Sequence, residues 1–338
     1  MLTARKEAVL KAIVGDYIST VSPVGSHVIA QKRNLSVSPA TIRMEMAGLE
    51  EEGYIIRPHT SAGGIPSDKG YRHYVERLAD RTDLAPGEKE LIQRQLDREE
   101  VDLEEWARTA AMVLPRITGN LAFITIPKAT QVRLKRLELI VIQELLIMLI
   151  LILQETRIIR HLFTLEEAVP QRELTVMSNK LSDTFAGVTS SEIESSDAEL
   201  TLLEEQFMRL ASDLMRAEEL KSYEEPLFDG LHQLFEQPEF SRAEILRDFM
   251  EVLEARGHIG GVVEKIYSGP GVQVAIGEEL RDTGMRHFSL VIGEYGIQGH
   301  MRGVAGLLGP KRMDYVKNIS AVHYLAEVMS QLMEEVYR

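Results

Sequence analysis

The chain has 338 residues, 44% of them hydrophobic and 27% charged, which is typical of a globular protein with two or three domains. It has no cysteine, and this excludes disulfide bonds, thiolate metal sites and a cysteine nucleophile. The formal net charge is −14, but up to Ala85 there are 11 Lys and Arg against 10 Asp and Glu, and beyond it 27 against 42. The near-neutral first region is therefore the one suited to an anionic partner such as DNA.

The first region predicts helices separated by turns, followed by a strand and a loop. Thr3 is a predicted N-cap, and Ser38-Pro39 gives an N-cap followed by proline at the first helical position. Ser67 begins a further helix after a loop rich in glycine and proline. This order is typical of a winged helix-turn-helix. The predicted elements are helices over 3–19, 26–33 and 39–52, a strand over 54–57, a loop over 58–66 and a helix over 67–78.

The third helix separates its residues into two faces. Ile42, Met46 and Leu49 form one apolar stripe, which we expect to pack against the first helix. The opposite face is small and carries a single arginine, as expected of a helix that approaches a DNA major groove closely. A solvated helix in a domain that binds no DNA is the alternative for this pattern. The outward residues are Ala40, Thr41, Arg43, Met44 and Ala47.

The middle of the chain predicts a helix over 88–114 and strands over 120–161. Its most apolar run, 137–153, is too short for a membrane helix and contains Glu138 and Glu144. We therefore predict two strands on either side of a turn at Gln143-Glu144. No basic leader precedes an apolar stretch at the N-terminus, so we expect a cytoplasmic chain without a membrane anchor.

A heptad-like stripe of large apolar residues follows a polar stretch over 189–197, which we expect to be a junction. The stripe covers about two repeats, and two interpretations stay open: a dimer seam, or a helix packed within its own domain. A helix over 243–253, strands near 272–276, 288–292 and 303–309, and a final helix over 315–336 complete the chain. The stripe consists of Leu200, Leu203, Phe207, Leu210 and Leu214.

The sequence carries no recognisable catalytic motif. Its nine histidines show no metal-ligand spacing, and neither a phosphate-binding loop nor a nucleophile elbow occurs. Arg302, Lys311 and Arg312 form a small basic cluster, for which a surface turn is favoured over an anion site. We predict that the protein is not an enzyme and holds neither a cofactor nor a metal ion.

Two segments resemble the HrcA family of heat-inducible transcription repressors of bacteria: SPATIRMEMAGLEEEGYI, residues 38–55, and PHTSAGGIPSDKGYRHYV, residues 58–75. Shorter motifs at 16–26, 238–240 and 309–315 are similar to the same family, so the resemblance covers the whole chain. It implies an α+β multidomain fold: a winged helix-turn-helix over 1–85, a GAF-like α/β domain over 88–187 and 270–338, and an inserted dimerising α/β domain over 188–269.

The resemblance also implies a function. A homodimer would bind an inverted-repeat operator (CIRCE) in double-stranded DNA upstream of chaperone operons and repress them, with the chaperonin GroEL promoting the active repressor. The stripe around Phe207 would then lie in the dimerising insert. The residues expected at the DNA are Lys32, Arg33, Ser38, Ala40, Thr41, Arg43, Met44, Arg57, His59, Thr60, Ser61, Lys69 and Arg72.

The chain departs from the family pattern at two of these positions. The family usually has Asn at the position of Met44 and Arg at that of Gly64, so operator preference should differ here. Two other functions stay open: a regulator whose GAF-like domain binds a small molecule, and a protein–protein module whose winged helix binds no DNA.

Overall fold

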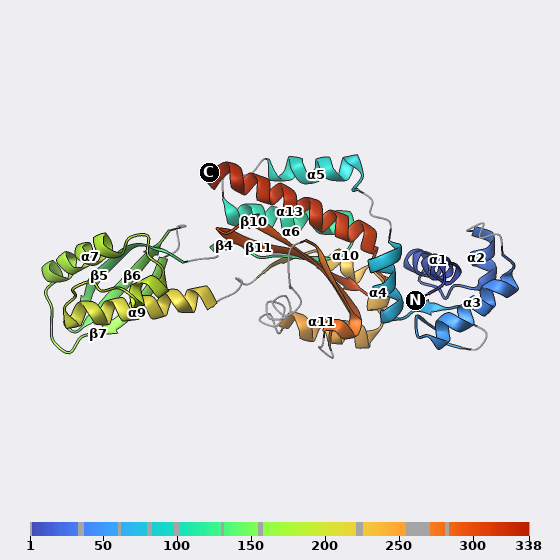
Figure 1. Ribbon diagram of the computed structural model, residues 1–338, viewed down its shortest axis with the longest axis horizontal. Helices are drawn as coiled ribbons and strands as arrows, with labels where there is room; N and C mark the ends of the chain where they lie inside the picture. The colour runs from blue at the N-terminus through green and yellow to red at the C-terminus, as the bar shows by residue number, and fades with distance from the viewer. Residues whose placement is uncertain are drawn as a thin grey trace. The chain divides into compact units, whose positions relative to one another are not determined.

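The computed structural model describes residues 2–32, 37–59, 62–79, 83–97, 102–129, 132–154, 158–220, 226–254, 271–280 and 284–337 (Figure 1). The chain divides into two compact units, and helices and strands mix in both. We call residues 2–79 the head and the remainder of the first unit the body. The first unit comprises Met1–Pro127, Tyr223–Ile297 and Gly303–Arg338, and the second Lys128–Ser222 and Gln298–Arg302.

Three helices of the head, α1, α3 and α4, begin at a hydroxyl cap. Thr3, Ser38 and Ser67 all have extended backbone, and each side chain accepts a hydrogen bond from an amide three residues later, which confirms the three predicted starts. The last helix, α4, passes directly into a π-helical turn, η1. The elements of the head are α1 (Ala4–Thr20), α2 (Ser26–Lys32), α3 (Pro39–Glu51), β1 (Ile55–Ile56), β2 (Ile65–Pro66), α4 (Asp68–His73) and η1 (Tyr74–Leu78).

The core of the head is built from the predicted helical stripes. Ile42, Met46 and Leu49 of α3 are buried, as are most apolar residues of α1, and α3 contacts both α1 and α2. Burial of such side chains contributes about 1.5–3 kcal/mol each. The inward stripe of α3 is thus used by the fold, and its opposite face is left over.

The body is a sheet between two helical layers. Its strands follow the order β8-β3-β11-β10-β9, and Figure 1 shows α6 and α13 on one side of the sheet and α11 on the other. The predicted helix over 88–114 is in fact two helices. The elements of the body are α5 (Pro86–Leu96), α6 (Leu103–Thr118), β3 (Leu121–Ile124), β8 (Leu227–Asp229), α10 (Leu231–Phe235), η2 (Pro238–Ser241), α11 (Ala243–Glu254), β9 (Gln273–Ile276), η3 (Gly277–Leu280), β10 (Phe288–Ile297), β11 (Met301–Pro310) and α13 (Tyr315–Tyr337).

Aromatic side chains fill the space between the sheet and α11. Phe240, Phe249 and Phe288 pack with ring centroids 5.4–6.0 Å apart, and Phe123 of β3 belongs to the same buried cluster. On α6, Trp106 is only 4% exposed. The body core is therefore packed with its own side chains.

The second unit is a three-stranded antiparallel sheet, β5-β6-β7, with helices on one face. β5 and β6 meet at the turn Glu144-Leu145, so the most apolar run of the sequence forms two strands, as predicted. None of the described helices has the length and apolarity that a membrane span requires. The elements of the unit are β4 (Lys128–Ala129), which pairs with the start of β11, β5 (Leu134–Gln143), β6 (Leu146–Leu153), β7 (Ile158–Thr164), α7 (Gln171–Phe185), α8 (Ser190–Glu194) and α9 (Leu202–Leu220).

The heptad-like stripe of α9 faces the sheet of its own unit. Phe207 is fully buried and contacts Phe163 of β7 at 5.4 Å between ring centroids. Leu200, Leu203, Leu210 and Leu214 pack against the same core. The stripe therefore packs within its own unit, which is the second of the two interpretations given for it.

The unit boundaries also differ from the predicted domains. The second unit begins at Lys128, well before residue 188, because β5–β7 pack with α7 and α9 in one apolar cluster instead of joining the body sheet. It ends at Ser222, well before residue 269. Within the predicted polar junction, a capping box between Thr189 and Glu192 starts the short helix α8.

Candidate nucleic-acid interface

The first turn of α3 is fixed by its own cap. Pro39 follows Ser38, whose Oγ accepts a hydrogen bond from the Thr41 amide at 3.2 Å and lies 3.0 Å from the Thr41 Oγ1. Proline at the start costs no hydrogen bond, because the first helical amides lack an intrahelical acceptor. The remaining amides and the helix dipole make this end attractive to a phosphate group.

The outer face of α3 is open. Ala40, Arg43, Met44 and Ala47 are exposed, and Met44 reaches 76% exposure. Arg43 makes no ion pair or hydrogen bond with any residue that the structure describes. An exposed arginine and a largely exposed methionine, next to the small residues Ala40 and Ala47, present both a polar and an apolar contact to an approaching duplex.

A two-stranded ribbon follows α3 in the chain of the head. β1 and β2 pair antiparallel, with Ile55 opposite Pro66, and the loop returns through a backbone bridge between Val24 and Gly64. A side chain at Gly63 is impossible here, because its Cβ would lie 2.4 Å from the carbonyl carbon of Val24. The end of the loop that leads into β2 is therefore held closely against Val24 of the head.

The predicted site residues around this loop differ in their exposure and in their partners. His59 is exposed, whereas Arg57 is half-buried and pairs with Glu50 at 3.2 Å. Lys69 is exposed, and its ammonium donates to the Glu52 carbonyl at 2.8 Å. Lys32 ends α2, and its side chain is not among the described parts, while the remaining predicted residues, Arg33, Thr60 and Ser61, lie outside the described residues.

Arg72 does not belong with this group. Its guanidinium donates to both carboxylate oxygens of Glu279 and to the Val274 carbonyl in the body. The ion pair with Glu279 raises the pKa of Arg72, so the side chain is charged and occupied. Sequence reasoning missed Ile56, whose side chain is 53% exposed on the ribbon; the alternation of Ile55 inward and Ile56 outward is the signal for it.

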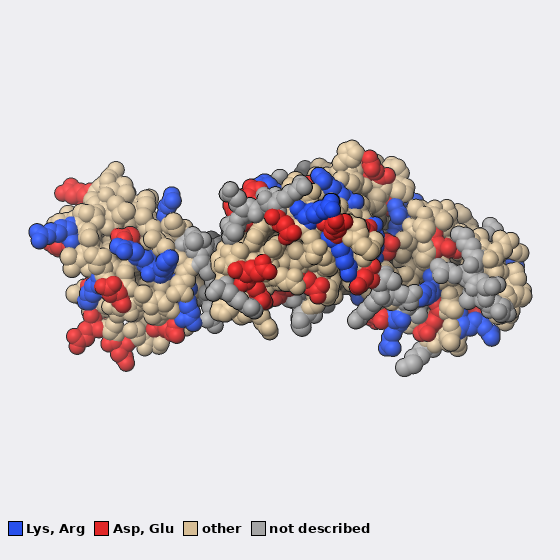
Figure 2. All heavy atoms as spheres, turned by 90° about the horizontal axis from the view of Figure 1, so that it is seen from above, with Lys and Arg blue, Asp and Glu red and all other residues tan. Residues whose placement is uncertain are grey.

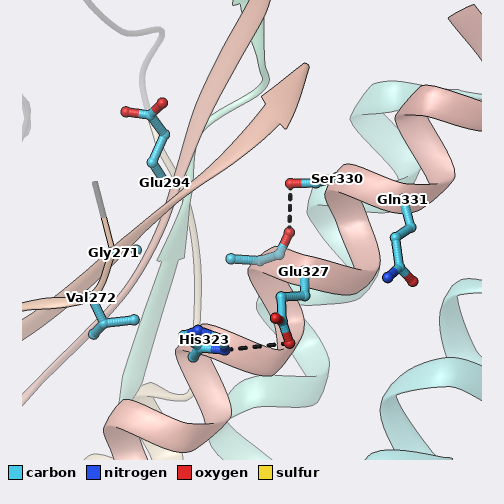
Figure 3. A pocket seen from close by; sticks show the side chains of 9 residues that line it. Gly271, Val272, Glu294, His323, Glu327, Ser330 and Gln331 are labelled. Carbon is cyan, nitrogen blue, oxygen red and sulfur yellow. Dashed lines mark hydrogen bonds and ion pairs between the residues drawn. The ribbon is translucent and has the colours of Figure 1, made fainter. Parts of the chain in front are cut away.

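A shallow pocket of about 300 Å³ lies on the body between Gly271-Val272, β10 and α13 (Figure 3). Its polar groups are largely satisfied within α13: His323 pairs with Glu327 at 3.3 Å, and the Ser330 hydroxyl donates to the Ala326 carbonyl at 2.7 Å. The Gly296 amide also donates to Ser330. The pocket thus offers few uncommitted groups to a ligand.

Three potential metal ligands converge elsewhere on the body. The ligand atoms of Glu244, Asp248 and His287 lie within 4.8 Å of one another. Arg286 donates to Glu244 at 3.1 Å and to His287 at 3.2 Å. Its guanidinium therefore already supplies the positive charge that a metal ion would bring to these ligands. Burial lowers the pKa of His287, and Arg286 lowers it further, which keeps the imidazole neutral.

Charge is mixed on one face of the body. On the face seen in Figure 2, acidic and basic side chains are interspersed over the body. This face of the body therefore gives no broad attraction for a polyanion.

Comparisons with known proteins place the chain among regulators of transcription by name. The model described as "HrcA protein C terminal domain" matches residues 104–319. A protein of Dehalococcoides mccartyi named heat-inducible transcription repressor HrcA is 40% identical, over 100% of this chain and 97% of its own. One of the same name from Roseiflexus castenholzii is 37% identical, over 99% of this chain and 96% of its own.

A solved structure described only as that of a hypothetical protein has the same fold. It superimposes with a TM-score of 0.64 at 26% identity and covers 99% of both chains. The family model and the full-length relatives agree with one another. This chain belongs to the HrcA family.

Proposed function

We propose that this protein is a repressor of transcription that binds double-stranded DNA through its head, which we interpret as a winged helix-turn-helix. The single observation that carries the proposal is the outer face of α3: it starts at a capped helix end, consists of small residues, and exposes Arg43 and Met44 without using either in the fold. A major groove admits one helix whose first turns carry small side chains.

The parts of this surface have separate roles. Arg43 is placed to read a base edge, and the capped end with Ser38 and Thr41 is placed to contact a phosphate. The loop between β1 and β2 forms the wing, where we include His59, Thr60 and Ser61. Lys69 keeps further N–H donors beyond the one given to Glu52, and it completes the phosphate contacts. We do not include Arg72 among the DNA contacts, because its guanidinium donates to the carboxylate of Glu279.

We further propose that the protein acts as a homodimer through the second unit, and that the outer face of its sheet is the contact surface. The helices cover the inner face, while the outer face exposes apolar side chains in rows across the strands. One row joins Ile140, Met148 and Leu162, which are cross-strand neighbours. Large exposed apolar patches mark contact surfaces, and a two-fold dimer pairs the same patch on both copies.

Two heads related by a two-fold axis call for an inverted-repeat operator, because each head reads only a short half-site. By the resemblance to the family, we propose a CIRCE-type operator before chaperone operons, with the chaperonin GroEL promoting the active repressor. On the same ground we interpret the body as a GAF-like domain, which carries the head and the second unit.

The test is an electrophoretic mobility shift with a CIRCE-type inverted-repeat duplex and a scrambled duplex of equal length, each with and without GroEL. We expect the inverted repeat to bind at least about a thousandfold more tightly than the scrambled duplex at physiological salt. GroEL should increase the bound fraction of the inverted repeat only. Equal binding to both duplexes would contradict specific DNA binding, and an unchanged shift with GroEL would contradict the chaperonin part alone.

A further inference from the structure

Helix α4 carries charged contacts to the body that the DNA-binding surface does not explain. The carboxylate of Asp68, at the first position of α4, pairs with the ammonium of Lys311 and accepts the Glu278 amide at 3.1 Å. The turn at Gly277 is shaped around this carboxylate, because a Cβ there would lie 2.1 Å from it. Asp68 is thus enclosed by the body from two directions.

One turn further along α4, Arg72 makes the second contact. Its Nε donates to Glu279 at 2.8 Å and its Nη2 to the Val274 carbonyl at 2.6 Å. Glu279 is itself oriented by the Ile276 amide, which donates to it at 2.9 Å. A bidentate arginine–carboxylate pair fixes direction as well as distance.

The third contact lies at the end of α1. Arg312 of the body is held by the carboxylate of Glu239, and its Nη1 donates to the Ile18 carbonyl at 3.3 Å. This carbonyl is one of the last four of α1, which lack an intrahelical partner and carry the negative end of the helix dipole. Between these charged contacts, the rings of Tyr71 and Tyr315 pack with centroids 5.7 Å apart.

Helix α4 is equally well fixed to the head. Gly70 lies so close to the head that a Cβ there would be 2.1 Å from the Tyr54 carbonyl oxygen. The Ser67 hydroxyl donates to the Gly53 carbonyl at 2.6 Å, and His73 contacts Glu7 at 3.3 Å. One short helix therefore contacts both the head and the body through specific bonds on each side, and these contacts contribute to the direction of α3.

We propose that Asp68, Arg72, Lys311 and Arg312 are positioning residues that hold the head on the body and thereby set the half-site separation that the dimer accepts. This inference rests on the proposed function, since it concerns the binding of a two-headed dimer to an operator. The four residues touch no DNA. They act through the direction of α3, which they determine from the opposite end of the head.

The physical reason is the effective concentration of the second head. Once one head is bound, the second binds as part of the same molecule, and a rigid connection concentrates it at one separation and depletes it at others. Loosening the connection spreads the second head over many positions. The affinity for a single half-site then stays the same, while the preference for one spacing falls.

The experiment compares the full-length protein with Arg72→Glu, Glu279→Arg and the double variant in which the pair is reversed. Arg94→Glu is the matched control, because among the described residues Arg94 pairs with Glu90 of the same helix α5 and with no residue of the head. Binding is measured on a duplex with one half-site, on the inverted repeat, and on repeats with the half-sites moved apart by about half a helical turn.

We expect the unaltered protein and Arg94→Glu to prefer one spacing strongly. Both single reversals should reduce that preference about tenfold with unchanged single half-site affinity, and the double reversal should restore most of it. Circular dichroism and thermal unfolding establish that every variant is folded. A spacing profile that stays unchanged in both single variants would overturn the proposal, as would the same loss on the single half-site.

A second measurement separates this inference from DNA binding itself. The chain lacks cysteine, so Glu51→Cys on α3 and Arg108→Cys on α6 provide two specific spin-label positions, with labelled protein diluted in unlabelled. Double electron–electron resonance between the two labels should give a narrow head–body distance distribution in the otherwise unaltered protein. Arg72→Glu should broaden this distribution, and the double reversal should narrow it again. A distribution that stays narrow in Arg72→Glu overturns the positioning role. Failure of every duplex to bind above the scrambled control overturns the proposed function instead.

Discussion

Helices α3 and α9 both carry periodic patterns that suggest a contact surface, and the fold treats them in opposite ways. In α9, the stripe of large apolar residues around Phe207 is consumed by the core of its own unit. In α3, the inward stripe is consumed as well, but the face of small residues with Met44 stays open. A stripe of large apolar residues therefore indicates what holds a unit together, and the face left over indicates what the unit offers to a partner.

The largest expected effect concerns the buried apolar stripe of α9. Phe207→Ala should lower the free energy of unfolding by about 3–5 kcal/mol, because it leaves a cavity in a close-packed core. Urea unfolding followed by circular dichroism measures the change. Leu202→Ala on the same helix is the control, since Leu202 is 81% exposed and should change stability little. Equal effects of the two substitutions would contradict the assignment of the stripe to the core.

The next effect concerns the outer face of the three-stranded sheet. Leu162→Asp should dissociate the dimer, because it places a charge on an apolar contact surface, and should weaken operator binding about a hundredfold through the loss of two-headed binding. Analytical ultracentrifugation gives the mass. Val176→Asp is the control, because Val176 is even more exposed (64% against 54% for Leu162) but lies on α7. A dimer that persists in Leu162→Asp would exclude this face.

A smaller effect is expected from the arginine on the open face of α3. Arg43→Ala should weaken operator binding by about 1–3 kcal/mol and relax the base preference at one position of each half-site. Titration of the inverted repeat and of a scrambled duplex separates two roles. Equal losses on both duplexes would make Arg43 a phosphate contact. Arg108→Ala, an exposed arginine of the body, should leave both affinities unchanged.

The smallest expected effect tests whether Met44 contacts a base of the operator. An exposed thioether suits the C5-methyl group of thymine, so replacing the contacted thymine by uracil should cost the unaltered protein about 0.8 kcal/mol, the value of one buried methyl-sized group. In Met44→Ala the same replacement should cost nothing. Scanning each thymine of a half-site by competition binding locates the base. A uracil effect that is the same in both proteins would show that Met44 contacts no thymine.

Local features were predictable from the sequence because their causes are local. The caps at Thr3, Ser38 and Ser67 each use a side chain and an amide three residues away. The turn between β5 and β6 was marked by polar residues inside an apolar run. The short helix α8 was missed, although the pair Thr189 and Glu192 is a capping box and could have revealed it.

Features that depend on distant residues were not predictable. Arg72 resembles a DNA contact by its position, and its partner Glu279 lies 207 residues away in the chain. Lys311 and Arg312 lie in a turn, as expected, but the sequence could not show that both hold groups of the head. In β6, every residue is apolar, so the pattern could not show that the unit covers only one of the two faces of this strand.

The single tryptophan of the chain gives the two units different optical signals. Trp106 is buried in α6 of the body, and the second unit contains no tryptophan. Indole emission therefore follows melting of the body alone, while ellipticity follows both units. Heating curves recorded by the two methods will coincide if the units unfold together, and will separate if one unit melts at a temperature of its own, so that the two signals together identify the unit that unfolds first.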